Sequence, residues 1–342
     1  MAGRYVANLQ INVDSTPLPP TVLRDVQSVT ISDALTMAST FTLRMNTWDS
    51  SHLRITWADS PLFALGQKLE ILLGYVDEPL TSLIVGTITD LDVEYQYDQP
   101  PTLTITGYDI RHQLAQASGF SSYKAALDSA IVNNVLTKSK VKASVTPTTV
   151  TWTSTTQNNE TNLAFLNRLA WRSGYDLTVL GEVVRFAPPS IFGPPLPLLM
   201  DKDLTNFSVS ISTGMLVNEI EIKGTDPSSN QQFVVTADVP TFPGTTMDDE
   251  YDAEAAYIND ITYPTQAECQ AVADAKAIDA ANDPLTGSGS GYGNPLLRAG
   301  VTIEVNGLGR RFSGSYRLQT VTHAVTADGG YVTSFTAKGA AE

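Results

Sequence analysis

Three histidines and one cysteine are the residues from which a metal or nucleophilic site would be built. His52, His112 and His323 are far apart in the sequence, and Cys269 stands alone. A zinc site made from neighbouring ligands needs spacings such as Cys-x-x-Cys or His-x-x-x-His, and the sequence contains neither. His323 lies in the alternating stretch 317–325, where a structural or interface histidine is more plausible than a general base. We therefore predict no metal site.

The remaining signatures of catalysis are also missing. The glycine-rich stretch 287–293 lacks the Gly-Lys-Ser/Thr ending of a phosphate loop, and the acidic run 247–254 lacks the residue order of a calcium loop. No Gly-x-Ser-x-Gly nucleophile elbow occurs. A pair of carboxylates suited to glycoside hydrolysis is uninformative here, because 36 acidic residues always offer one. These observations predict a protein without enzymatic activity, catalytic residues or cofactor.

Charge and composition further narrow the class of protein to which the chain can belong. The 342 residues include 21 Lys and Arg against 36 Asp and Glu, a net charge of −15. This balance disfavours nucleic-acid specificity and attachment to anionic lipid. No apolar run approaches the roughly 20 residues of a membrane helix, so we expect no stable membrane insertion. Charged residues make up only 17%, which favours a chain whose surface is partly covered by partners.

Hydrophobic residues alternate with polar ones along most of the chain. This period of two is typical of strands with one buried face. Turn signals rich in Pro, Gly and Asp separate the runs. The pattern predicts mainly antiparallel β structure, arranged in barrels or sandwiches. The clearest runs are 5–13, 41–45, 69–73, 103–105, 207–211 and 301–305.

Three segments instead carry a helical pattern. Apolar residues recur at helical spacing in 122–138 and 160–172, and Gly174 is placed to end the second helix in a left-handed conformation. The third helix, 265–281, opens with the capping box Thr265-x-x-Glu268. Two further stretches, 239–254 and 283–294, are rich in Gly, Pro or acidic residues and are predicted to be flexible loops.

The order of strands in the first third of the chain recurs near its end. Residues 66–107 run as a short strand, a glycine, a long strand, a hairpin and a strand ending in glycine, and residues 300–339 repeat that order. Any series of β-hairpins produces some likeness of this kind. The alternative interpretation is two copies of one small barrel with a helical segment between them.

One segment resembles a known family. The stretch Asn159-Glu-Thr-Asn-Leu-Ala-Phe-Leu-Asn-Arg-Leu-Ala-Trp-Arg-Ser-Gly-Tyr175 is similar to a segment of hub proteins in contractile injection machines, including phage late control protein D and the N-terminal half of VgrG. The stretches 28–45, 107–114 and 314–323 are similar to the first hairpin, the turn into the helical segment and the closing strand of that family. Structural or interface roles are thereby implied for Glu160, Thr161, Phe165, Leu166, Arg168, Leu169, Trp171, Gly174, Tyr175, Gly107, Asp109 and His323.

The resemblance implies a fold and a division of the chain. The fold is mainly β with α insertions: two antiparallel barrels like those of tail tube proteins, joined by a helical or αβ connector. Residues 1–115 would form the first barrel, 116–190 the connector and 191–342 the second barrel, with the helix 265–281 and the two loops inserted. We expect the helix 160–172 to pack between the barrels.

The resemblance also implies a role and its partners. The chain would be a homotrimeric baseplate hub that joins the hexameric tail tube, or a tube-initiator protein, to a central spike and lines the channel. Baseplate wedge proteins would surround it, and a tape measure protein or cargo could occupy the lumen. The chain stops at Glu342, so we expect the spike to be a separate protein. Synthesis in the bacterial cytoplasm and assembly into a virion or tail-like particle would follow. The alternative is a trimeric β-rich adhesin or receptor-binding tail protein.

Overall fold

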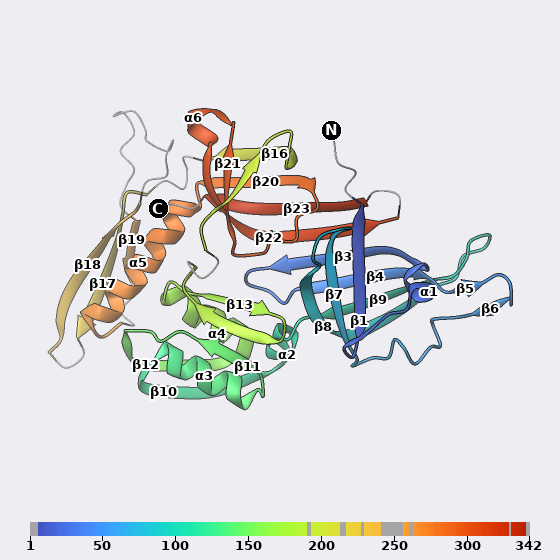
Figure 1. The fold of residues 1–342 in the computed structure, drawn as a ribbon. Helices are drawn as coiled ribbons and strands as arrows, with labels where there is room; N and C mark the ends of the chain where they lie inside the picture. The colour runs from blue at the N-terminus through green and yellow to red at the C-terminus, as the bar shows by residue number, and fades with distance from the viewer. Residues whose placement is uncertain are drawn as a thin grey trace.

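The computed structural model describes residues 6–189, 193–212, 217–226, 229–240, 256–259, 263–327 and 330–339. Strands dominate, most pairs of strands are antiparallel, and the helices are short insertions between them (Figure 1). The predicted fold class, mainly β with α insertions, is confirmed. Within the described residues, no helix is both long and apolar enough to cross a membrane.

The first strand group covers residues 7–108. Its strands pair in the order β3-β4-β9-β8-β7-β1-β2, all antiparallel. Alternation along these strands gives one buried core, which includes Ile11, Phe41, Leu43 and Ile71. The elements are β1 (Ala7–Val13), β2 (Thr16–Pro17), α1 (Pro20–Leu23), β3 (Val26–Ala34), β4 (Thr40–Asn46), β5 (Trp48–Asp49), β6 (Arg54–Ile55), β7 (Lys68–Tyr75), β8 (Thr81–Glu94) and β9 (Thr102–Tyr108).

A connector with a separate hydrophobic core follows. It contains α2 (Arg111–Gln116), β10 (Ser118–Leu127), α3 (Asp128–Lys138), β11 (Lys142–Val145), β12 (Thr151–Thr161), α4 (Asn162–Arg172), β13 (Asp176–Leu180) and β14 (Val183–Ala187). The helix predicted over 122–138 starts only at Asp128, so the prediction was wrong for residues 122–127. Residues 118–127 form β10 because they pair along their length with β12, and this pairing outweighs the local helical spacing.

The second strand group is formed by β15 (Leu196–Leu199), β16 (Leu204–Ile211), β20 (Leu285–Tyr292), β21 (Thr302–Asn306), α6 (Gly309–Phe312), β22 (Gly314–Thr326) and β23 (Gly330–Gly339). Beside it stands a smaller layer in which α5 (Gln266–Asn282) packs on β17 (Glu219–Asp226) and β18 (Gln231–Asp238), with β19 (Ala256–Asn259) parallel to β17. The helix predicted over 265–281 is confirmed to within one residue, and the side chain of Thr265 caps it as expected. From residue 241 to its end, the predicted loop 239–254 lies outside the described residues.

The predicted flexible loop 283–294 is wrong, because most of it is the strand β20. This strand pairs with β16 on one side and with β23 on the other. Its glycines occupy every second position and face the core, while Thr and Ser face outwards. A Cβ atom on Gly289 would lie 2.9 Å from the Phe335 ring and 3.0 Å from the Phe207 ring. These glycines therefore make room for aromatic side chains rather than giving the chain mobility.

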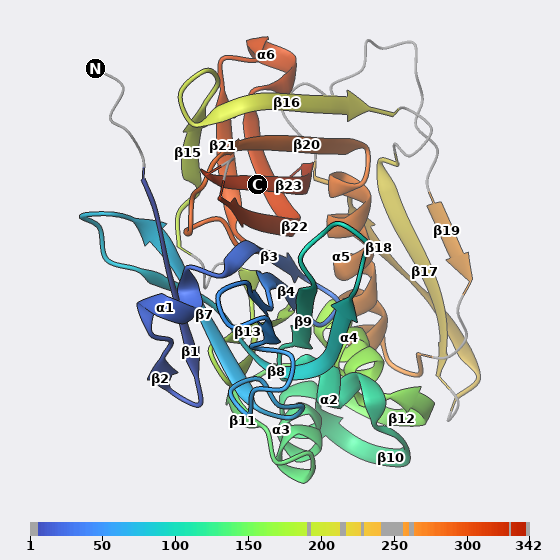
Figure 2. The same cartoon turned by 90° about the vertical axis from the view of Figure 1, so that its right-hand side faces the viewer.

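The internal repeat seen in the sequence is visible in the pairing of strands. β7, β8 and β9 form one antiparallel meander, and β21, β22 and β23 form another. The two groups are joined because β22 also pairs with β3, from Thr320 opposite Ala34 to Thr326 opposite Ser28. Figure 2 shows β22 and β3 as neighbours where the groups meet. Within the described residues, the pairings therefore form one connected sheet rather than two separate ones.

The helix α4 packs its apolar side into the connector. Leu163, Phe165, Leu166 and Leu169 pack in the core of the connector, against residues of α2, α3 and β13. On its polar side, α4 also contacts the first strand group, because Asn167 donates to the carbonyl of Thr36 at 2.7 Å. The two strand groups are joined directly by strand pairing and by the polar contacts described below.

Candidate functional site

The residues of the sequence motif around α4 stabilise the connector. Thr161 is the N-cap, and its Oγ1 accepts a hydrogen bond from the backbone N–H of Ala164 at 3.1 Å. Phe165, Leu166 and Leu169 are completely buried. Gly174 has a φ of 64°, which confirms the predicted left-handed end of the helix.

The polar and aromatic members of the same motif tie α4 to its surroundings. Arg168 pairs with Glu160 at 2.5 Å and donates to the carbonyl of Thr156 at 2.8 Å. The indole N–H of Trp171 donates to the carboxylate of Asp279 on α5. Tyr175 donates its hydroxyl to the carbonyl of Pro147 at 2.9 Å. Each motif residue therefore has a contact that positions the connector, and none of them is directed at a common reaction centre.

A buried ion pair in the connector escaped the sequence analysis. Arg172, the last residue of α4, pairs with Asp128 at the start of α3 and donates to Thr155 Oγ1 at 2.8 Å. Its guanidinium also lies 3.8 Å from the centre of the Trp152 ring. No local pattern indicates this pairing, because the two charges are 44 residues apart and each would ordinarily be exposed.

Gly107 and Asp109 lie at the corner where β9 leaves the first strand group. A Cβ atom on Gly107 would lie 2.3 Å from the carbonyl oxygen of Thr87 and 2.4 Å from the Phe41 ring, so only glycine fits. The Asp109 carboxylate accepts from the backbone N–H of Ser39 at 3.1 Å and from the backbone N–H of Arg111 at 2.8 Å. It also pairs with the Arg111 guanidinium at 2.8 Å.

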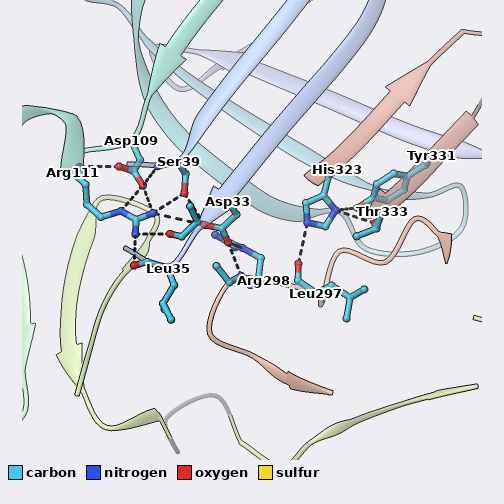
Figure 3. Close-up of polar contacts among 12 residues, drawn as sticks. Asp33, Leu35, Ser39, Asp109, Arg111, Leu297, Arg298, His323, Tyr331 and Thr333 are labelled. Carbon is cyan, nitrogen blue, oxygen red and sulfur yellow. Dashed lines mark hydrogen bonds and ion pairs between the residues drawn. The ribbon is translucent and has the colours of Figure 1, made fainter. Parts of the chain in front are cut away.

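Arg111 extends this corner into a buried polar network (Figure 3). Its guanidinium donates to the carbonyl of Ala34 at 2.8 Å and to Ser39 Oγ at 2.6 Å. The Ser39 hydroxyl in turn donates to Asp33 at 2.7 Å. Asp33 and Ala34 end β3, the strand that pairs with β22. The network therefore stands beside the junction of the two strand groups.

Asp33 carries the network across to the second strand group. Its carboxylate accepts from the Arg298 guanidinium at 2.9 Å and from the backbone N–H of Ala299 at 3.1 Å. Burial by itself would raise the pKa of Asp33, but Arg298, the Ser39 hydroxyl and Arg111 together hold that pKa below its usual value. Asp33 is therefore a buried carboxylate that stays ionised and links both groups.

His323 stands beside this network and is fully buried. Its Nε2 lies 3.0 Å from the carbonyl of Leu297, which can only accept, so Nε2 carries the proton. Its Nδ1 then accepts from the Tyr331 hydroxyl at 2.8 Å. Burial and the nearby Arg298 lower the pKa of His323 to about 4. His323 is thus neutral at pH 7 and fixes segment 294–300 against β22 and β23.

The sequence motifs are brought together only in part. Asp109 and His323 lie near one junction, where Asp33, Ser39, Arg111 and Arg298 complete the contacts (Figure 3). Gly107 precedes this junction at the end of β9. The connector residues from Glu160 to Tyr175 form a separate cluster. Asp33, Ser39 and Arg111 lie within the stretches 28–45 and 107–114 of the resemblance but were not selected as candidates, and Arg298 lies outside them. Local sequence does not reveal charge pairs between distant segments. Within the described residues, no group of three His, Cys, Asp or Glu is placed to hold a metal ion.

The fold resembles that of phage tail proteins. A 43 kDa tail protein of prophage MuSo2 from Shewanella oneidensis aligns over 97% of this chain and 98% of its own length, with a TM-score of 0.70 and 14% identity. A tail protein from Neisseria meningitidis MC58 aligns over 98% and 96%, with a TM-score of 0.69 and 13% identity. At these identities the likeness establishes a shared fold.

A third solved structure extends the comparison to secretion systems. The E. coli protein c3393, described as a type VI secretion system component with structural similarity to the T4 tail proteins gp27 and gp5, aligns over 97% of this chain and 76% of its own. Its TM-score is 0.60 and its identity 14%.

Among curated proteins, none matches the sequence. The sequence model of the Alg8 N-terminal domain matches residues 4–327, and the chain belongs to that family.

Proposed function

We propose that the chain is a structural baseplate hub of a contractile phage tail or tail-like particle. Three copies would form a ring that joins the hexameric tail tube to a central spike and lines the channel. The proposal is supported by the fold shared with tail proteins and by the similarity of the sequence motifs to hub proteins. The role is one of assembly, without chemical turnover.

The observation that carries the proposal is the repeated meander. β7-β8-β9 and β21-β22-β23 give one chain two similar strand groups, which three chains would present as six. A ring of three could then dock on a tube with sixfold symmetry. Such docking needs the two groups to keep a fixed relative orientation. The β22–β3 pairing and the ionised Asp33 between Arg111 and Arg298 provide that rigidity.

We further propose a division of the chain to match this role. Residues 1–115 form the first tube-like unit, 116–190 the connector, and 191–342 the second tube-like unit. The separate hydrophobic cores support this division. The partners would be two further copies, a tube or tube-initiator protein, a central spike protein and wedge proteins, with a tape measure protein or cargo in the lumen. The site of action would be the baseplate of a virion or tail-like particle.

The alternative, a receptor-binding tail protein, has one observation in its favour. Tyr95 and Tyr97 are strongly exposed at the tip of the β8–β9 hairpin, and exposed tyrosines are frequent in binding surfaces. Tyr292, at the end of β20, is also exposed. This alternative gives a different result in the experiment below.

The test is an assembly measurement on the purified full chain, alone and mixed with a candidate spike protein. Light scattering gives the mass, and negative-stain imaging gives the symmetry. We expect a complex of three chains per spike trimer, seen end-on as a ring with six lobes and an axial channel. A chain that stays monomeric with the spike present, and binds bacterial surface glycans instead, would contradict the hub and favour the adhesin.

A further inference from the structure

A cavity lies where the first strand group, the connector and the second strand group meet. Its volume is about 310 Å³, at the lower end of the range for ligand sites. It is lined by the end of β3, the start of β8, Arg111 of α2, the β13–β14 hairpin and segment 295–301. The cavity thus adjoins the buried junction network and opens beside it.

The charged lining is unusual for so acidic a chain. Three arginines, Arg111, Arg185 and Arg298, face the cavity against one aspartate, Asp33. Arg111 and Arg298 are already paired with carboxylates of the junction. The side chain of Arg185 has neither a hydrogen bond nor an ion pair within the described part of the chain. The cavity therefore has a net positive charge and one guanidinium available to a ligand.

The rim of the cavity is apolar on two sides. Leu180, at the end of β13, is 56% exposed, and Leu296, in segment 295–301, is 58% exposed. These side chains come from different parts of the chain, yet both line the same opening. A small inorganic anion inside the cavity would leave them in water. Large apolar side chains around a polar pocket are typical of surfaces that bind protein segments.

We propose that this cavity docks an acidic, aliphatic segment of a partner protein. An aspartate or glutamate side chain of that segment would enter the cavity and pair with Arg185, whose planar guanidinium matches a carboxylate with two parallel hydrogen bonds. A neighbouring aliphatic side chain would cover Leu180 and Leu296. Arg111 and Arg298 contribute positive potential while keeping their bonds within the junction. The site does not require the chain to be a hub, because it rests only on the lining of the cavity.

If Arg185 serves binding, its replacement should affect the stability of the fold differently from replacement of Arg111. Because Arg185 shares the cavity with two other cations and has no carboxylate partner in the described residues, its removal relieves repulsion. We therefore expect Arg185→Gln to melt at the same temperature as the wild type or higher. An arginine that serves the fold would lower the melting temperature when replaced, as expected for Arg111.

The binding test uses fluorescein-labelled, capped hexapeptides on the full-length protein. One peptide alternates leucine with aspartate, and the control alternates leucine with asparagine. By fluorescence anisotropy, we expect the aspartate peptide to bind at least about tenfold more tightly, and Arg185→Gln to weaken it by about tenfold. Arg44→Gln is the matched control, since Arg44 is an exposed arginine on β4 paired with Glu94. Leu296→Ser should also weaken binding.

Four outcomes would overturn the proposal. They are no binding of the aspartate peptide, equal binding of the asparagine peptide, unchanged binding by Arg185→Gln, and succinate binding as tightly as the peptide. The last would assign the cavity to a free small anion. If Arg185→Gln fails to fold, Arg185 serves the fold and the assignment is wrong for that residue. Leu296→Ser, on an exposed side chain, then still decides whether the rim binds peptide.

Discussion

Burial of His323 makes the stability of this protein depend on pH in a predictable direction. The folded-state pKa of about 4 lies below the ordinary value of 6.5, because burial and Arg298 disfavour the charged imidazole. Between these two values the unfolded chain binds a proton that the folded chain does not. The free energy of unfolding therefore falls as the pH drops from about 6.5 to about 4 and is fully retained above 6.5.

The size of the effect follows from the same two values. Linkage gives a loss of about 2.5 kcal/mol from this one residue between pH 7 and pH 4.5. The suitable variant is His323→Gln, whose amide can still donate to the Leu297 carbonyl but does not titrate. At pH 7 we expect it to be less stable by about 1–3 kcal/mol, because the Tyr331 hydroxyl loses its acceptor.

The assay is urea unfolding of both proteins at pH 7.0, 5.5 and 4.5, followed by circular dichroism. The carboxylates titrate in both proteins, so their effects on the free energy of unfolding cancel when the variant is compared with the wild type at each pH. We expect the wild type's greater free energy of unfolding to shrink steadily as the pH falls, and the difference to vanish or reverse near pH 4.5. A constant difference across this range would refute the reasoning. So would an NMR titration that places the pKa of His323 near 6.5.

Two further variants test the junction and the corner before α2. Arg111→Ala should lower the free energy of unfolding by about 3–5 kcal/mol, because it leaves Asp109 buried without its partner, whereas Arg44→Ala should change it by less than about 1 kcal/mol. If both variants lost the same free energy of unfolding, the stabilising role of the junction network would be contradicted. Gly107→Ala should cost at least about 1–3 kcal/mol, since the new Cβ meets a backbone oxygen at 2.3 Å. Gly119→Ala, with its nearest contact at 3.6 Å, is the control in the same denaturation assay.

Strand alternation made much of the fold predictable. The runs 41–45, 69–73 and 103–105 became β4, β7 and β9, because alternation forces one face into the core. The errors came where pairing with distant strands decided the outcome. Residues 118–127 formed β10 against β12, and the glycine-rich stretch 283–294 formed β20 between β16 and β23.

The candidate site was less predictable than the fold. The sequence resemblance indicated Asp109, Gly107 and His323. In the structure, Asp109 and His323 are buried and Gly107 has no room for a Cβ atom. Asp33 and Arg298 were not selected, although they link the two strand groups over 265 residues of sequence. Nothing local distinguishes such residues from ordinary surface charges, since their burial depends on strands that meet only after folding.

The sequence alone determined the strand-rich class, the repeated meander and the caps of α4 and α5. These features depend on side-chain period and on contacts within a few residues, which are local properties. The tertiary structure alone decided that β22 pairs with β3, that glycines of β20 accommodate Phe207 and Phe335, and that three arginines line one cavity. Those features depend on contacts between distant segments, whose partners are fixed only when the whole chain has packed.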